Sequence, residues 1–193
     1  MSFWKALFGK TDLPKSDLDR VFALVTAQTT LEVNLGWTPA GRAGICVKPQ
    51  DSGDFAASER EMVELLRFAA QESRSEVQVQ TDEYNYRWFL FSDPDLDDLV
   101  NLIHMAGQTL SEHGYGPQML SAAFRFKRTR DGDRPGFLIY NYKRANFYPF
   151  VALNEADKKR DNAEELHASG QLSTEMPIER DQSRWFALWG SPV

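Results

Sequence analysis

One hairpin decides the fold of this chain. Its first strand is QMLSAAFRFKR (118–128), its connector is TRDGDRP (129–135), and its second strand is GFLIYNYKR (136–144). Both strands are rich in aromatic and branched apolar residues, which favour extended backbone. The connector combines glycine, proline and aspartate, which favour turns. The stretch therefore predicts two antiparallel strands with a large aromatic area to bury.

More strands are predicted on both sides of this hairpin. EVQVQ (76–80) alternates in polarity, DEYNY (82–86) is typical of a turn, and RWFLF (87–91) returns as a buried strand. NFYPFVAL (146–153) follows the hairpin, and Pro149 within it indicates an edge strand, because proline has no N–H to donate to a neighbour.

The pattern before residue 50 is less regular. Apolar side chains at positions 31, 33, 35 and 37 alternate with polar or small ones, which predicts a strand over 29–37. TPAG (38–41) then predicts a turn, and AGICVKP (43–49) a second strand. We interpret this region as a hairpin, with a longer preceding helix as the alternative.

Four segments predict helices from their apolar spacing and their caps. They are residues 14–28, 58–73, 92–116 and 161–170. The expected N-terminal caps are Ser16, Ser58 with Glu61, Asp93 followed by Pro94 at the first helical position, and Asp161. Gly114 is the expected stop of the third helix.

Hairpins separated by helices predict an α+β fold, in which helices pack on a mainly antiparallel sheet. The chain has 193 residues, of which 42% are hydrophobic, and this suits one globular domain. We expect a short amphipathic segment over residues 1–12, followed by a single domain over 13–193.

Charge and cysteine content narrow the classes of function. The net charge of −6 argues against a general nucleic-acid binder. Cys46 is the single cysteine, so neither an internal disulfide nor a cysteine-rich zinc site can form, and a reducing compartment is indicated. We expect Cys46 to be a small buried residue. No apolar run approaches the roughly 20 residues of a membrane span, and we therefore expect a cytoplasmic protein.

No motif for catalysis is present in the sequence. It contains no phosphate-binding glycine loop, dinucleotide fingerprint, serine elbow or paired histidines at metal-binding spacing. The acidic stretch DPDLDD (93–98) is typical of a helix start, where carboxylates meet the positive end of the dipole. We therefore predict a non-enzyme without a metal site or a cofactor.

Two neighbouring segments, YNYKRANFYPF (140–150) and KKRDN (158–162), combine aromatic rings with cations. They indicate either an aromatic cluster in which Arg160 and Asp161 pair locally, or a surface for an acidic partner, an anionic lipid headgroup or a phosphate. The closing RWFALWG (184–190) should pack as a clasp, because its rings carry too much apolar area to stay in water. The binding candidates are Tyr140, Tyr142, Lys143, Arg144, Asn146, Tyr148, Arg160, Asp161 and Asn162.

The opening MSFWKALFGK (1–10) predicts an amphipathic helix that orders only when docked, since ten residues are too few for a stable free helix. Its apolar face could enter the lipid interface with lysines toward anionic headgroups. The alternative is docking on its own domain or on a second copy in a homodimer. The membrane-contact candidates are Phe3, Trp4, Lys5, Leu7, Phe8 and Lys10.

Several of these segments, taken in order, resemble the PspAB family of PspA-associated proteins from prokaryotic membrane-stress systems. They are YGPQML (115–120), YNYKRANFYPF, KKRDNAEEL (158–166) and RWFALWG, together with the opening residues and PAGRAGICVKP (39–49). The resemblance implies an accessory protein that binds a PspA-like partner or the inner membrane surface. It brings no catalytic residues.

Three functions follow from these observations. The first is a non-enzymatic accessory protein of a membrane-stress response. The second is a cytoplasmic chaperone-like domain that holds a client peptide on an open sheet face or in a dimer groove. The third is an enzyme or small-molecule binder in which Lys143, Arg144 and Arg160 converge on a phosphate or carboxylate in one pocket.

Overall fold

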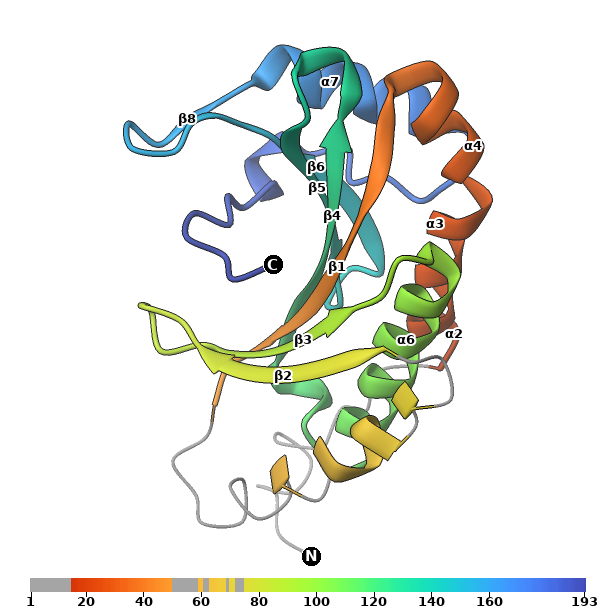
Figure 1. Cartoon of the computed structure of the whole chain (residues 1–193), viewed down its shortest axis with the longest axis vertical. Coiled ribbons are helices and arrows are strands. Elements are labelled where there is room, and N and C mark those ends of the chain that lie inside the picture. The colour runs from red at the N-terminus through yellow and green to blue at the C-terminus, as the bar shows by residue number, and fades with distance from the viewer. Residues whose placement is uncertain (1–14, 50–58, 61–62, 69, 72–74) are drawn as a thin grey trace, which may run out of the picture.

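The computed structural model describes residues 15–49, 59–60, 63–68, 70–71 and 75–193. A six-stranded antiparallel sheet in the order β2-β3-β1-β4-β5-β6 forms its centre, which confirms the α+β class (Figure 1). The strands are β1 Trp37–Val47, β2 Glu76–Thr81, β3 Arg87–Ser92, β4 Met119–Arg128, β5 Arg134–Asn141 and β6 Asn146–Phe150. A small hairpin joins β7 Ala152–Asn154 to β8 Lys159–Arg160.

Helices cover one face of this sheet. The longest are α6, Leu96–Glu112, and α7, Asn162–Leu172. A chain of short turns runs from α2 Lys15–Asp19 through Arg20–Phe22, α3 Ala23–Thr26 and α4 Gln28–Thr30 to Leu31–Leu35. Residues 59–60, 63–68 and 70–71 are also helical, and short 3-10 turns lie at Gly116–Gln118, Thr129–Asp131 and Gln182–Arg184.

The period of two along each strand divides the apolar side chains between the two faces. On what we call the helix face, Phe89 and Ile45 pack with the stripe of α6 in the main core. On the opposite face, Trp88 and Cys46 belong to a second cluster, together with Trp185 from the C-terminal tail, residues 182–193. This tail lies in the hollow of the curved sheet, away from α2, α3 and α6 (Figure 1). We call this side of the sheet the tail face.

The long hairpin and its neighbours are confirmed. β4 pairs with β5 over eight residue pairs, from Ser121 opposite Asn141 to Arg128 opposite Arg134. β2 pairs with β3 as predicted. β6, which contains Pro149, is the last strand of the sheet.

The strand predicted over 29–37 is wrong. Residues Leu31–Leu35 form a π-helical turn that continues the N-terminal helices. Leu31 and Leu35 are buried, whereas Val33 is 64% exposed, so the apolar spacing that packs here is four residues rather than two. The predicted turn at 38–41 is also wrong, because it lies within β1 at a bulge between Pro39 and Arg42. β1 therefore pairs with β3 and β4 and not with 29–37.

Gly36 separates the helical and extended segments. Its φ of +70° is a left-handed conformation that favours glycine, and it ends the helical turn before Trp37 starts β1. A Cβ at this position would lie 2.8 Å from Cγ of Arg130.

Two of the predicted N-terminal helix caps are wrong, whereas one predicted cap and the predicted helix stop are confirmed. Ser16 lies inside α2, and α6 is capped by Asp95, whose side chain accepts from the Asp97 N–H at 2.8 Å. Asp93 instead holds the preceding turn by accepting from the Asp95 N–H at 2.8 Å. Asp161 caps α7, and Gly114 follows α6 with a φ of +82°.

The capping box of Ser58 and Glu61 and the amphipathic segment 1–12 lie outside the described residues. Among the helices that the structure describes, none is long and apolar enough to cross a membrane.

Candidate functional site: a pocket on the tail face

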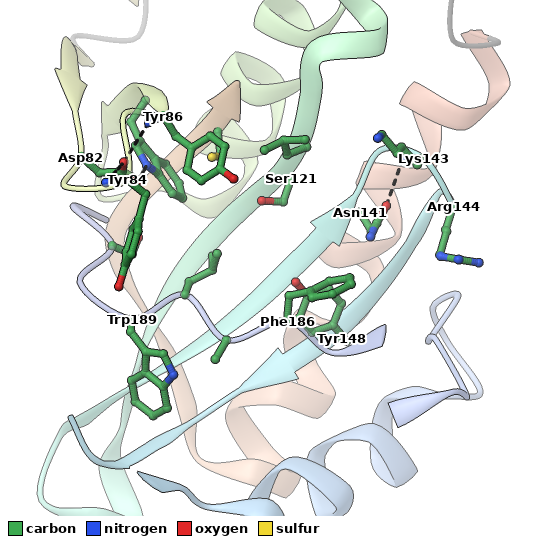
Figure 2. Close-up of a pocket in the computed structure, with 16 residues that line it drawn as sticks. Asp82, Tyr84, Tyr86, Ser121, Asn141, Lys143, Arg144, Tyr148, Phe186 and Trp189 are labelled. Atoms are coloured by element: carbon green, nitrogen blue, oxygen red, sulfur yellow. Dashed lines mark hydrogen bonds between the residues drawn. The ribbon is translucent and has the colours of Figure 1, made fainter. Parts of the chain in front are cut away.

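A pocket of about 710 Å³ opens between the tail and the sheet on the tail face. It extends from the turn between β2 and β3 to the turn between β5 and β6, with the tail as one wall (Figure 2). Most of its lining is apolar or aromatic. The lining residues are Cys46, Asp82, Tyr84, Tyr86, Trp88, Leu120, Ser121, Asn141, Lys143, Arg144, Tyr148, Phe186, Ala187, Leu188, Trp189 and Ser191.

The floor of the pocket is one row of residues across four strands. Trp88 lies opposite Cys46, Cys46 opposite Ser121, and Ser121 opposite Asn141. Directly opposed residues share a face, so the register alone places these four side chains side by side. The floor changes from apolar at Trp88 to polar at Asn141.

At the apolar end, Asp82 fixes the turn between β2 and β3. Its Oδ1 accepts from the backbone N–H groups of Tyr84 and Tyr86, both at 2.9 Å, and its Oδ2 accepts from the indole N–H of Trp88 at 2.8 Å (Figure 2). Three donors occupy this carboxylate. Asp82 therefore holds the backbone of the turn and orients the indole ring of Trp88.

At the polar end, the turn between β5 and β6 carries two exposed cations. The Oδ1 of Asn141 accepts from the Lys143 N–H at 3.0 Å, which shapes this turn (Figure 2). No carboxylate of the described residues pairs with the Lys143 ammonium, and Arg144 lies 3.9 Å from Glu179 with 42% of its side chain exposed. This end of the pocket is positively charged and open to solvent.

The tail wall is anchored by Arg160 and Trp185. Arg160 donates from Nη1 to the Trp185 carbonyl at 2.5 Å, and from Nε to both carboxylate oxygens of Glu165 at 3.0 and 3.1 Å. The guanidinium carbon also lies 5.3 Å from the ring centre of Phe150, a cation–π contact. Trp185 is 7% exposed and donates to the Glu179 carbonyl at 2.9 Å. The predicted clasp is therefore formed by Trp185, while Phe186 is 60% exposed at the pocket mouth.

Two ionisable groups in the pocket are held in their neutral forms. Burial, together with the nearby Asp82 charge, raises the pKa of the Cys46 thiol to about 12. Burial also raises the pKa of Tyr148. A protonated thiol is a poor nucleophile and a poor metal ligand. The described residues contain no cluster of three histidine, cysteine or acidic side chains placed to hold a metal ion.

The predicted binding candidates are divided between several places. Lys143, Arg144 and Tyr148 line the pocket. Tyr140 and Tyr142 are buried on the helix face, and their rings meet edge to face. Asn146 donates to Glu179 at 3.0 Å, Asp161 caps α7, and Asn162 is exposed at the start of that helix.

Arg160 and Asp161 do not form the predicted local pair. Arg160 pairs with Glu165, and Asp161 lies 3.8 Å from Nη1 of Arg128. The two side chains diverge because Arg160 reaches the tail while Asp161 turns back to cap α7. Arg160 is not part of the pocket lining, so the three cations of the third hypothesis do not converge there.

Sequence reasoning missed most of the pocket. Cys46, Trp88, Ser121 and Asn141 come from four strands, and each segment alone contains only one of them. The alternation within β4 could have placed Ser121 on the face opposite Ala122 and Phe124. Which residue of β1 lies beside it depends on a register that the sequence does not state.

Comparison with known protein families identifies a match to the whole chain. A family model, PspAB, described as PspA associated protein B, matches residues 1–193. The chain belongs to the PspAB family. Membership links it to PspA in an accessory role, which agrees with the resemblance seen in the sequence. No curated protein and no solved structure matches the chain.

Proposed function

We propose that this member of the PspAB family is a non-enzymatic accessory protein of a membrane-stress response that binds a PspA-like partner. The observation that carries the proposal is the family match over residues 1–193. The neutral Cys46 thiol and the carboxylate of Asp82, which is occupied by three donors, favour binding over catalysis at the pocket.

We place the partner contact at the mouth of the pocket. Tyr84 is 52% exposed at the β2–β3 end of the pocket and Phe186 is 60% exposed on the tail wall, and both line the same pocket as Lys143 and Arg144. Aromatic residues and arginine are enriched in the centres of protein interfaces. The chain as a whole is acidic, with a net charge of −6, so this local basic rim favours a partner with an acidic surface.

The opening segment is proposed to contact the inner face of the membrane. Phe3, Trp4, Leu7 and Phe8 supply apolar area, and Lys5 and Lys10 supply charge for anionic headgroups. Burying one large apolar side chain contributes about 1.5–3 kcal/mol. This role places the protein in the cytoplasm with peripheral membrane contact.

Two assays on the full-length chain test these contacts separately. Lys143→Glu with Arg144→Glu should lower capture by purified PspA at least tenfold, whereas Lys158→Glu with Lys159→Glu, the same charge change outside the pocket lining, should not. Trp4→Glu with Phe8→Glu should abolish flotation with vesicles of anionic phospholipid. If the folded native protein is captured neither by PspA nor by the vesicles, the proposed function is refuted.

A chaperone-like peptide-binding domain is the second candidate. The tail face favours it, because the second cluster there is covered by the tail and by turn and hairpin residues such as Tyr86 and Ala152 rather than by a described α-helix. A homodimer would complete a groove of the kind such domains use. Sedimentation together with binding of unfolded client peptides distinguishes the candidates, since a monomer that binds PspA but no client peptide contradicts this second one.

A further inference from the structure

We propose that the interior of the pocket binds a small organic anion with an apolar body. Its anionic group would lie at Ser121, Asn141 and Lys143, and its body would lie against Leu120 and the tail residues Leu188 and Trp189. This is a ligand site in its own right and does not depend on partner binding at the pocket mouth.

The volume and walls suit a single ligand of this kind. Pockets for small molecules measure about 300–1,000 Å³ and are mostly apolar with a few polar groups at fixed positions. The present pocket measures about 710 Å³. Trp88 and Tyr148 are almost fully buried and support the floor from below. Leu120, Leu188 and Trp189 stay partly exposed in the lining and offer apolar surface to the ligand body.

The polar end contains donors that the protein itself leaves unused. The Oδ1 of Asn141 already accepts from the Lys143 N–H, so its free group is the Nδ2 donor. Neither this Nδ2, nor the Ser121 hydroxyl, nor the Lys143 ammonium has a hydrogen-bond partner in the part of the chain that the structure describes. Two neutral donors and one cation together suit an acceptor-only group such as a carboxylate, a phosphate or a sulfonate.

The opposite end excludes the reverse orientation. Asp82 is the acidic residue of the lining, and its two oxygens already accept three hydrogen bonds. In the reverse orientation the anionic group of the ligand would face the Asp82 carboxylate, which accepts hydrogen bonds and has none to donate. The charge gradient along the floor favours an anion at the β5 end and an uncharged body at the β3 end.

Ligands of this chemistry come from two sources. One is a lipid acid with an acyl chain, which would connect the pocket to the membrane. The other is a soluble aromatic acid. Both present one anionic group on an apolar body, so the pocket accepts either and the experiment must separate them.

A matched pair of fluorescent probes tests the proposal on the full-length protein. 8-Anilinonaphthalene-1-sulfonate carries an aromatic body with a sulfonate, and N-phenyl-1-naphthylamine carries the same body without charge. We expect the sulfonate to bind at one site at least tenfold more tightly than the neutral probe. Equal affinity for the two probes overturns the proposal.

Variants locate the site. Lys143→Gln should weaken sulfonate binding about tenfold and leave the neutral probe unchanged, whereas Lys127→Gln, the same change on β4 outside the lining, should affect neither. Ser121→Leu places a larger side chain on the pocket floor and should abolish binding of both probes. If Ser121→Leu fails to fold, Leu120→Trp, which enlarges another lining residue, serves as the pocket-filling variant instead. Equal effects of Lys143→Gln and Lys127→Gln contradict the site.

Competition then identifies the source. Displacement of the sulfonate by laurate indicates a lipid acid, and displacement by indole-3-acetate indicates a soluble aromatic acid. Displacement by neither overturns the proposal. If Ser121→Leu abolishes capture by PspA while no probe binds the native protein, the pocket is part of the PspA-binding surface and is not a site for a small ligand. The ligand proposal then fails while the proposed function stands.

Discussion

The substitution Arg160→Met removes the residue that joins the tail to α7. Arg160 donates from Nε to Glu165 at 3.0 and 3.1 Å and from Nη1 to the Trp185 carbonyl at 2.5 Å. Glu165 is only 2% exposed. Methionine keeps much of the side-chain volume but leaves the Glu165 carboxylate buried without its cation.

Removing one partner of a buried ion pair costs about 3–5 kcal/mol, because the remaining charge has neither water nor a counter-ion. We therefore expect the free energy of unfolding to fall by about 4 kcal/mol. For a urea m value of about 2 kcal/mol/M, this shifts the unfolding midpoint down by about 2 M. Circular dichroism across a urea series measures the shift.

A second substitution shows where the cost arises. Glu165→Gln keeps an oxygen for the Val151 N–H, which donates to Glu165 at 2.8 Å, but removes the charge. The double variant Arg160→Met with Glu165→Gln should therefore regain most of the lost stability. Arg134→Met removes an exposed pair with Asp131 and should leave the midpoint unchanged.

The loss of unfolding free energy caused by Arg160→Met should also depend on pH. Burial raises the pKa of Glu165 despite the adjacent Arg160, and loss of Arg160 removes influences that lower this pKa, so it rises further. A carboxyl whose pKa is higher in the folded than in the unfolded state gains stability as pH falls between the two values. The difference in unfolding free energy between Arg160→Met and the native protein should therefore become smaller as the pH falls from about 8 to about 5. A gap that is constant with pH, or a double variant no more stable than Arg160→Met, refutes the reasoning.

Three further outcomes follow from local structure. Cys46 is buried, and the pKa of its thiol is raised to about 12. Its reaction with a disulfide reagent near pH 8 should therefore be at least a hundredfold faster in the urea-unfolded protein than in the folded protein. Equal rates in the two states would contradict its burial. Asp95→Ala should destabilise the protein by about 1 kcal/mol in thermal unfolding through loss of the α6 cap, and Asp95→Asn by much less. Tyr142→Phe should be neutral or stabilising by about 1 kcal/mol in urea unfolding, because its buried hydroxyl has no partner in the described structure.

The sequence predicted those elements whose signals are local. The hairpin of β4 and β5 follows from two apolar segments around a glycine-containing connector, and the Asp161 cap follows from an acidic residue before a helical pattern. Both depend on contacts between residues close in the chain. They therefore need no knowledge of the tertiary structure.

The errors arose where two patterns fit the same residues. Leu31 and Leu35 satisfy the spacing of a strand and of a helix, and burial by the main core selects the helix. Asp93 and Asp95 both precede α6 with cap-forming side chains, and the backbone geometry of Asp95 decides between them.

The pocket could not be predicted in this way. Its floor requires the register between β1 and β4, which includes a shift between Cys46 and Val47. Its wall forms because the tail returns across the sheet, where Arg160 holds it by a hydrogen bond to the Trp185 carbonyl. The sequence alone instead predicts that Arg160 binds a partner or a ligand. Register and tail placement both come from long-range packing.

The two edges of the sheet are not equivalent. At β6 the Phe147 N–H donates to the Pro177 carbonyl at 2.7 Å and the Phe147 carbonyl accepts from the Glu179 N–H at 2.8 Å, so this edge is partly covered at Phe147. At β2, no described strand pairs with the outer side, and its exposed residues are Glu76, Gln78, Gln80 and Thr81. Among the described strands, β2 therefore offers the more open border for intermolecular strand addition, which is the first step of many kinds of protein aggregation. The charged and amide side chains there keep that border hydrated and discourage polymerisation.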